Sequence, residues 1–177
     1  YAFYISKGDS VKKLLEVKEL DVNYIFLKKD NQENTQNKYS FNKGPKPDDF
    51  ESALIKSVLD DDTNKLDLLI KHPTFDKNVS NVNKAIFLSI KENNIQIFHK
   101  LINLIDINEF TYENNKLLAT VIQQKNININ ILQDILNDPN FDSKKNDFLN
   151  AFLLILYIRQ QSLEIIEIMY KYDHDHE

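Results

Sequence analysis

The stretch Asn94-Ile95-Gln96-Ile97-Phe98 decides the fold, because related stretches recur twice further along the chain. Asn128-Ile129-Asn130-Ile131-Leu132 follows 34 residues later, and Ser162-Leu163-Glu164-Ile165-Ile166 follows after another 34. Self-similarity at a fixed period is the mark of a repeat architecture. Within these stretches the apolar residues continue at helical spacing, which predicts one helix for each copy.

A second series of repeats lies before the first. Asn83-Lys84-Ala85-Ile86 recurs as Asn115-Lys116-Leu117-Leu118 at a shift of 32, and Ser52-Ala53-Leu54 lies 32 residues before Lys84-Ala85-Ile86. Each unit therefore reads as two short helices, and the two-residue difference in period falls near 125–127. We expect first helices at 50–59, 83–91, 115–124 and 148–159, and second helices at 64–71, 95–104, 129–137 and 163–171.

A polar turn follows the second helices. Asp21-Val22-Asn23, Asp76-Lys77-Asn78 and Asp106-Ile107-Asn108 share the pattern Asp-x-Asn, and Asp142 and Asp173 hold the corresponding place in the last two units. Pro73 and Pro139 precede two of these turns, where proline stops a helix. Asp and Asn suit a tight turn because their side chains bond the local backbone.

The period of 32 to 34, the paired helices and the terminal Asp-x-Asn turn resemble ankyrin repeats. The resemblance implies an all-α fold, an ankyrin-like helical-repeat solenoid of about 4–5 helix-turn-helix units. Residues 1–27 would form a partial first repeat, and 50–177 four more, as part of a longer array. The glycine between the two helices survives only as Gly8. Asp61 and Asn93 take its place, as residues that tolerate the left-handed conformation.

Residues 28–49 break the period. The segment is polar, carries Gly44, Pro45 and Pro47, and offers only Tyr39 and Phe41 as large apolar side chains. Such a composition does not bury enough surface to offset the entropy of ordering. We expect a flexible polar insertion at the hairpin position, either a tolerated loop or a binding loop anchored by the two aromatic residues.

Composition excludes several classes of function. The net charge is −5, Arg159 is the one arginine, there are two glycines, and there is no cysteine. These features argue against nucleic-acid binding, phosphate-binding loops, disulfides and thiolate zinc sites. No stretch reaches the roughly 20 apolar residues of a membrane-spanning helix. We expect no catalytic residue, cofactor or metal, with His174 and His176 in a solvated tail, and a cytoplasmic location.

The resemblance implies a non-enzymatic scaffold that binds a protein partner through the concave face of the solenoid. Two alternatives remain: a targeting segment of a larger multidomain enzyme such as a kinase or ubiquitin ligase, or an obligate structural component of a large, for example cytoskeletal, assembly. The apolar C-terminal unit is expected to be covered by further repeats or another chain. By register the outward positions of the concave face are Lys56, Leu59, Asp60, Leu88, Lys91, Glu92, Thr120, Gln123, Gln124, Tyr157 and Ile158.

Overall fold

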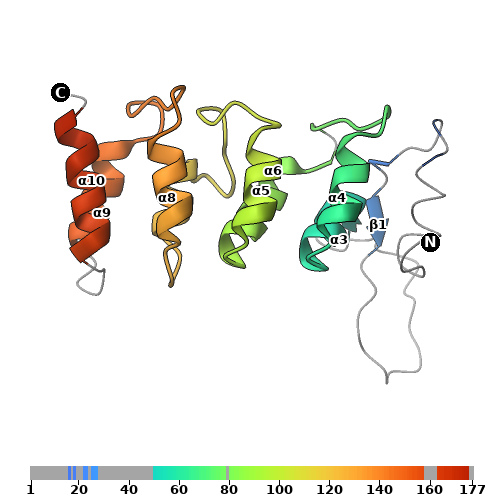
Figure 1. The fold of residues 1–177 in the computed structure, drawn as a ribbon, viewed down its shortest axis with the longest axis horizontal. Coiled ribbons are helices and arrows are strands. Elements are labelled where there is room, and N and C mark those ends of the chain that lie inside the picture. Colours follow the sequence, from blue (N-terminus) through green and yellow to red (C-terminus); the bar gives the residue numbers. More distant parts are fainter. Residues whose placement is uncertain are drawn as a thin grey trace, which may run out of the picture. The chain divides into compact units, whose positions relative to one another are not determined.

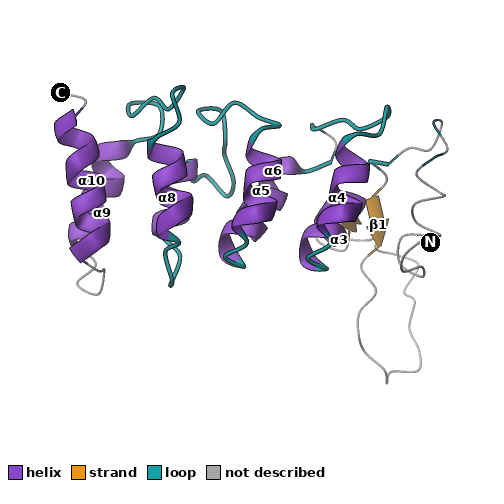
Figure 2. Ribbon diagram, viewed as in Figure 1, coloured by secondary structure: helices purple, strands orange, loops and turns teal. Residues whose placement is uncertain are grey.

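The computed structural model describes residues 16, 18, 22–23, 25–27, 50–78, 80–157 and 163–175. The expected insertion at 28–49, most of the expected partial repeat at 1–27, and Ile158 lie outside these residues. The described part is helical apart from one short two-stranded ladder (Figure 2), which confirms the expected all-α class. The chain divides into two compact units, Tyr1–Val82 and Asn83–Glu177.

In its described residues, the first unit contains β1 (Ile25–Leu27), β2 (Phe50–Ser52), α3 (Ala53–Leu59) and α4 (Thr63–Ile70). The two strands pair antiparallel, with Ile25 opposite Ser52. The expected helix start at residue 50 is therefore wrong, because residues 50–52 are extended. Ser52 ends the strand and caps α3: its Oγ accepts a hydrogen bond from the Ile55 N–H at 3.2 Å, which a helix N-cap requires.

The second unit holds α6 (Ile95–Ile102), α7 (Leu117–Ile122), α8 (Ile129–Leu136), α9 (Phe148–Tyr157) and α10 (Leu163–Asp175), while α5 (Val82–Lys91) begins at the last residue of the first unit. Helix α7 packs against α8 and α9. Helix α10 packs against α9 and against α8, its neighbour in Figure 1. A helix thus contacts its hairpin partner and also the helix two places along the chain. Helix α10 runs to Asp175, so His174 lies on the last turn of a helix, where it is exposed as expected, and His176 lies outside the described residues.

The turn from α3 to α4 and the turn from α5 to α6 are the same. Asp61 (φ 53°) and Asn93 (φ 60°) are left-handed, as expected for residues in the place of a glycine. The Asn94 N–H reaches the Ser89 carbonyl at 2.8 Å and the Asn93 N–H reaches that of Ile90 at 3.1 Å, which is a Schellman motif. The side chain of Asn94 then accepts from the Ile97 N–H and begins the next helix. Two helices are thereby joined through residues 92–94.

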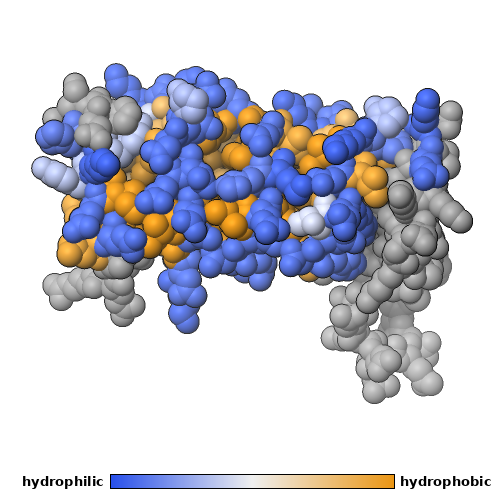
Figure 3. Space-filling view, in the orientation of Figure 1, coloured by the Kyte–Doolittle hydropathy of each residue, from blue (hydrophilic) through white to orange (hydrophobic). Residues whose placement is uncertain are grey.

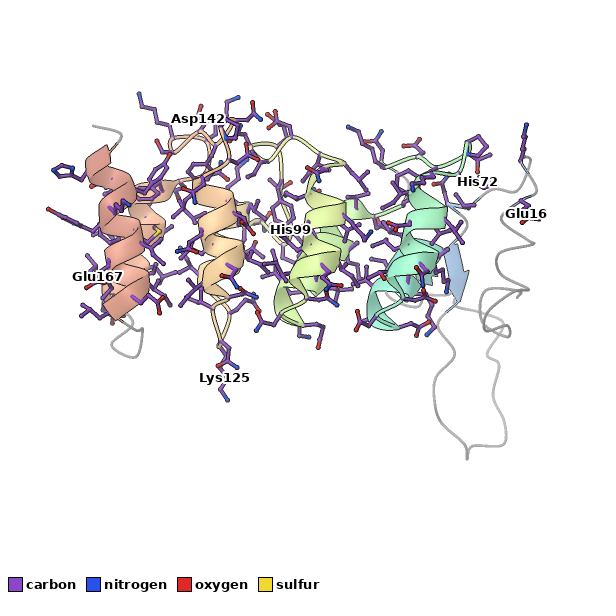
Figure 4. The ribbon with its side chains drawn as sticks, in the orientation of Figure 1. Glu16, His72, His99, Lys125, Asp142 and Glu167 are labelled. Atoms are coloured by element: carbon purple, nitrogen blue, oxygen red, sulfur yellow. The ribbon has the colours of Figure 1, made fainter. Side chains whose placement is uncertain are left out.

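The turn from α7 to α8 is built differently. It spans residues 123–128 and contains no left-handed residue. The sequence predicts two extra residues near 125–127, and the turn is indeed longer than the one at residues 92–94, by three residues. Lys125 projects from its tip (Figure 4). Asn128 restores the common pattern, because its side chain accepts from the Ile131 N–H at 3.3 Å and caps α8.

A tight turn also precedes α7. The backbones of Tyr112 and Asn115 exchange two hydrogen bonds, of 3.1 and 2.9 Å. Between them Glu113 (φ 49°) and Asn114 (φ 64°) are both left-handed, which matches a type I′ hairpin turn. Tyr112 stacks on Phe87 of α5, with ring centroids 4.6 Å apart.

Buried amides bridge successive turns within each unit. In the first unit Asn23 Oδ1 accepts from the Asp76 N–H at 2.8 Å and from Ser80 Oγ at 2.6 Å. In the second unit Asn108 Oδ1 accepts from the Asp142 N–H at 2.9 Å and from Asn146 Nδ2 at 2.8 Å.

These bonds correct the expected alignment of the Asp-x-Asn turns. Asp76 and Asp142 occupy the same place in the hydrogen-bond pattern, and each follows a Pro-x-aromatic stretch. Asn78 is therefore not equivalent to Asn23: it is exposed, and its N–H is bonded locally by the Asp76 carboxylate.

The core of each unit is aliphatic, with few aromatic residues. Branched residues and leucines fill it because the inner face of each short helix must be covered by its neighbours. The fully buried large side chains include Leu54, Ile55, Leu66 and Leu69 in the first unit, and Ile86, Ile97, Phe98, Leu101, Phe110, Leu117, Leu118 and Ile122 in the second.

Candidate interaction surface

The end of α3 carries the candidate residues of the first unit. Leu59 and Asp60 are exposed, and Lys56 is half-buried and ion-paired with Asp60. Asp60 Oδ2 also lies 4.0 Å from Nζ of the buried Lys65. Burial lowers the pKa of Lys65 below its usual value, and the charge of Asp60 partly opposes this shift.

The ends of α5, α7 and α9 carry the candidates of the second unit. Lys91, Glu92 and Gln123 are exposed at the ends of α5 and α7, and Tyr157 is 85% exposed at the end of α9. Gln123 donates to Asn115 Oδ1 at 3.1 Å, so its side chain lies back along α7. Since α7 packs against α9, the exposed Gln123 and Tyr157 end two neighbouring helices with a polar and an aromatic group.

Four of the expected outward residues are covered in part or in full, and the half-buried Lys56 is one of them. Leu88 and Gln124 are half-buried, and Gln124 donates to the Thr120 carbonyl. Thr120 itself is only 3% exposed, so its outward placement is wrong. Its hydroxyl donates to the Lys116 carbonyl one turn earlier, which satisfies the hydroxyl inside the helix packing.

A second candidate surface is the apolar exterior of α9 and α10. Helix α9 contains no charged residue, and hydrophobic side chains gather at the surface beside these two helices (Figure 3). Exposed apolar groups in such a cluster indicate a contact surface. The exposed large hydrophobic residues here are Leu149, Leu153, Leu156, Tyr157, Leu163 and Tyr170.

A pocket of about 300 Å³, which the sequence does not indicate, lies where α9 begins and α10 ends. Phe148 and Tyr172 form its aromatic wall, with ring centroids 5.0 Å apart. Burial raises the pKa of the Tyr172 hydroxyl, and the nearby Asp142 carboxylate adds to this shift. The remaining lining residues are Ser143, Lys144, Asp147, Leu149 and Asp173.

One exposed polar pair joins two helices of the second unit. His99 Nε2 of α6 lies 2.7 Å from Asp134 Oδ2 of α8, so an outward-facing histidine contacts its neighbour through a carboxylate. Surface pairs of this kind contribute about 0–1 kcal/mol. The pair lies at the contact between α6 and α8.

Comparison with protein-family models, with curated proteins and with solved structures found no match. Within the described ranges, no three histidine or carboxylate side chains come together as metal ligands. None of the helices described has the length and apolar content to cross a bilayer. The physical character of the two surfaces is therefore the basis for a functional argument.

Proposed function

We propose that the chain is a non-enzymatic protein-interaction scaffold, an ankyrin-like solenoid that binds a protein partner at the ends of its first helices. The observation that carries the proposal is Tyr157. An aromatic side chain that is 85% exposed contributes little to folding, whereas tyrosine is enriched among the residues that dominate binding energy.

The stacking in the second unit supports the repeat interpretation. Contacts between α6 and α8, α7 and α9, and α8 and α10 all join helices two places apart in the chain. Neighbour-to-neighbour contact of this kind is what a solenoid requires. The Schellman turns at Asp61 and Asn93 support equivalent two-helix units, since the same turn chemistry recurs at both.

The composition of the surface favours a protein partner. Lys91, Glu92 and Gln123 carry a cation, an anion and an amide, so no single charge dominates. Protein interfaces commonly combine a polar rim with an aromatic anchor. An anionic polymer would require a cationic surface instead.

The test is affinity for a partner identified by pull-down with the intact chain. Tyr157→Ala should weaken binding about ten-fold or more, the effect of losing an interface hot spot. Gln133→Ala, an exposed change on α8, is the matched control and should leave affinity unchanged. Equal affinity for the Tyr157 variant and the parent chain would contradict the proposed surface.

The obligate structural component is a second candidate, and the apolar exterior of α9 and α10 favours it. A permanent interface is more hydrophobic than a transient one. The expected result for this candidate is that the chain aggregates when expressed alone and becomes soluble with its partner.

A further inference from the structure

We propose that the outer face of α9 and α10 is the docking site for another helix pair built like α9 and α10 themselves. The outer face is defined here as Phe152, Leu156, Ile166 and Tyr170. This inference rests on the stacked repeats of the proposed function and adds the chemistry of the occupant.

The first argument is register. A shift of 34 residues relates α8 to α10 in the repeated sequence, and the same shift aligns α7 with α9. Ile122 of α7 is fully buried, whereas its equivalent Leu156 is 51% exposed. Leu136 of α8 is 4% exposed, whereas its equivalent Tyr170 is 62% exposed. Positions that are covered in one pair are thus apolar and uncovered in the next.

The second argument is that the polar positions agree as well. Gln133 and Asn137 of α8 are exposed, and their equivalents Glu167 and Lys171 of α10 are exposed and charged. Glu167 is labelled on α10 in Figure 4. Helix α10 therefore keeps a solvent-facing side distinct from its outer face, which is the pattern of a helix inside a stack.

The occupant follows from what covers Ile122 and Leu136. Helix α7 packs against α9, and α8 packs against α10. These contacts use the inner face of the α9–α10 pair, where Ala151, Ile155 and Met169 are buried. A partner that continues this interface must itself be a pair of helices. Its two helices must have the spacing of α9 and α10 and an apolar face like their inner face.

A second copy of the chain does not meet this requirement through its own α9 and α10. Their inner face is already buried within each copy. The occupant must instead be a helix pair whose inner face is free, in continuity with the α7–α9 and α8–α10 interface.

The experiment extends the chain by one pair. The expected match of Asp173 to Asp142 is wrong, because Asp173 lies within α10. The 34-residue shift places residue 176 opposite Asp142, so a second copy of residues 142–175 replaces residues 176–177 in the extended chain. Amide hydrogen exchange is measured in α9 and α10 of the full parent chain and of the extended chain. We expect exchange in α9 to slow by at least ten-fold on extension.

The substitution Leu156→Ser separates stacking from a general gain in stability. In the parent chain it should change exchange in α9 by less than two-fold, because the side chain faces outward. In the extended chain it should reverse most of the added protection. Tyr157→Ser is the matched control, because the equivalent Gln123 is exposed, and it should have no effect on exchange in either chain.

Two results would overturn the inference. One is unchanged exchange in α9 after extension, both with this added pair and with an added copy of residues 108–141. The other is a stable dimer of the parent chain that Leu156→Ser dissociates, which would assign the outer face to a second copy. The proposed function is tested by a different measurement, the affinity of the Tyr157→Ala variant for the partner. The two proposals can therefore fail independently.

Discussion

Asn23 in the first unit and Asn108 in the second make the same bridge to the following turn, but with different donors. Asn23 receives a hydroxyl hydrogen from Ser80, whereas Asn108 receives an amide hydrogen from Asn146. The serine completes the bridge with a single donor. Asn146 also brings its own side-chain oxygen, Oδ1, into the interior. No donor among the described residues reaches this oxygen. The same bridge therefore accepts either a hydroxyl or an amide donor, but the amide donor leaves one buried acceptor without a hydrogen bond.

The two units also bury different ionisable groups. Lys65 of the first unit has a lowered pKa, and Tyr172 of the second has a raised pKa; in both cases burial is the largest cause. Burial disfavours the charged form of each group, so the two shifts have opposite signs. Alkaline pH should therefore affect the two units in opposite directions.

The largest effect is expected from removing the bridging amides. Asn23→Ala and Asn108→Ala should each lower the free energy of unfolding by about 2–4 kcal/mol, because buried backbone groups lose their partners. Chemical denaturation, with hydrogen exchange to locate the loss in one unit, measures the effect. Asn78→Ala, at the exposed site, should change stability by less than about 0.5 kcal/mol. Equal losses at Asn78 and Asn108 would refute the assigned bridge.

Exchanging the donors should sharpen the comparison. Asn146→Ser keeps a donor for Asn108 and removes the unpaired oxygen, so the second unit should gain about 1 kcal/mol of stability. The reciprocal Ser80→Asn should destabilise the first unit by about 1–2 kcal/mol, through overpacking and a new unpaired acceptor. Thermal unfolding of both variants tests the pair. A loss in both would show that side-chain volume, not hydrogen bonding, decides this position.

Substitution in the left-handed turn before α7 should raise the stability of the second unit. Replacing Glu113-Asn114 by Asn-Gly suits the type I′ turn and should stabilise the second unit by about 1 kcal/mol. Asn93→Gly, at a residue type that already tolerates this conformation, should gain only a few tenths of a kcal/mol. Denaturation midpoints measure both changes, and a larger gain at Asn93 would contradict the assigned order.

The smallest effect is the pH dependence. Between the lowered pKa of Lys65 and the usual value of 10.5, Lys65 is protonated less in the native state than in the unfolded chain. The free energy of unfolding should therefore rise with pH in this window. Lys65→Met should remove that rise.

Tyr172 behaves in the opposite way. Between pH 10.0 and its raised pKa, Tyr172 is protonated more in the native state than in the unfolded chain. The free energy of unfolding should therefore fall as the pH rises through this window. Tyr172→Phe should remove that fall, and unfolding followed from pH 8 to 11 compares each variant with the parent chain. Slopes of the same sign at the two residues would contradict the assignment.

The helices were predictable because each one is encoded locally. Expected and observed starts agree within two residues for α5, α6, α7, α8, α9 and α10, since a polar cap precedes an apolar period at most of them. The left-handed Asp61 and Asn93 were also predictable from residue type. Residues 50–52 were not, because a strand of three residues depends on its partner at Ile25–Leu27.

The candidate surfaces were predictable only in outline. The register placed Lys91, Gln123 and Tyr157 outward correctly, because they recur at helix ends. It failed at Thr120, where packing between neighbouring helices buries a polar residue. The pocket beside Tyr172 carried no sequence signal, since its lining comes from α9, from α10 and from residues 143–147 before α9.

By itself, the sequence determined the paired helices, their caps and their period, because these depend on residues a few positions apart. Only the tertiary structure decided which turn each buried amide reaches. Asn23 and Asp76 are far apart along the chain, and nothing local distinguishes Asn23 from the exposed Asn78. The same holds for the outer face of α9 and α10, since composition makes a helix apolar but only packing determines which of its sides stays uncovered.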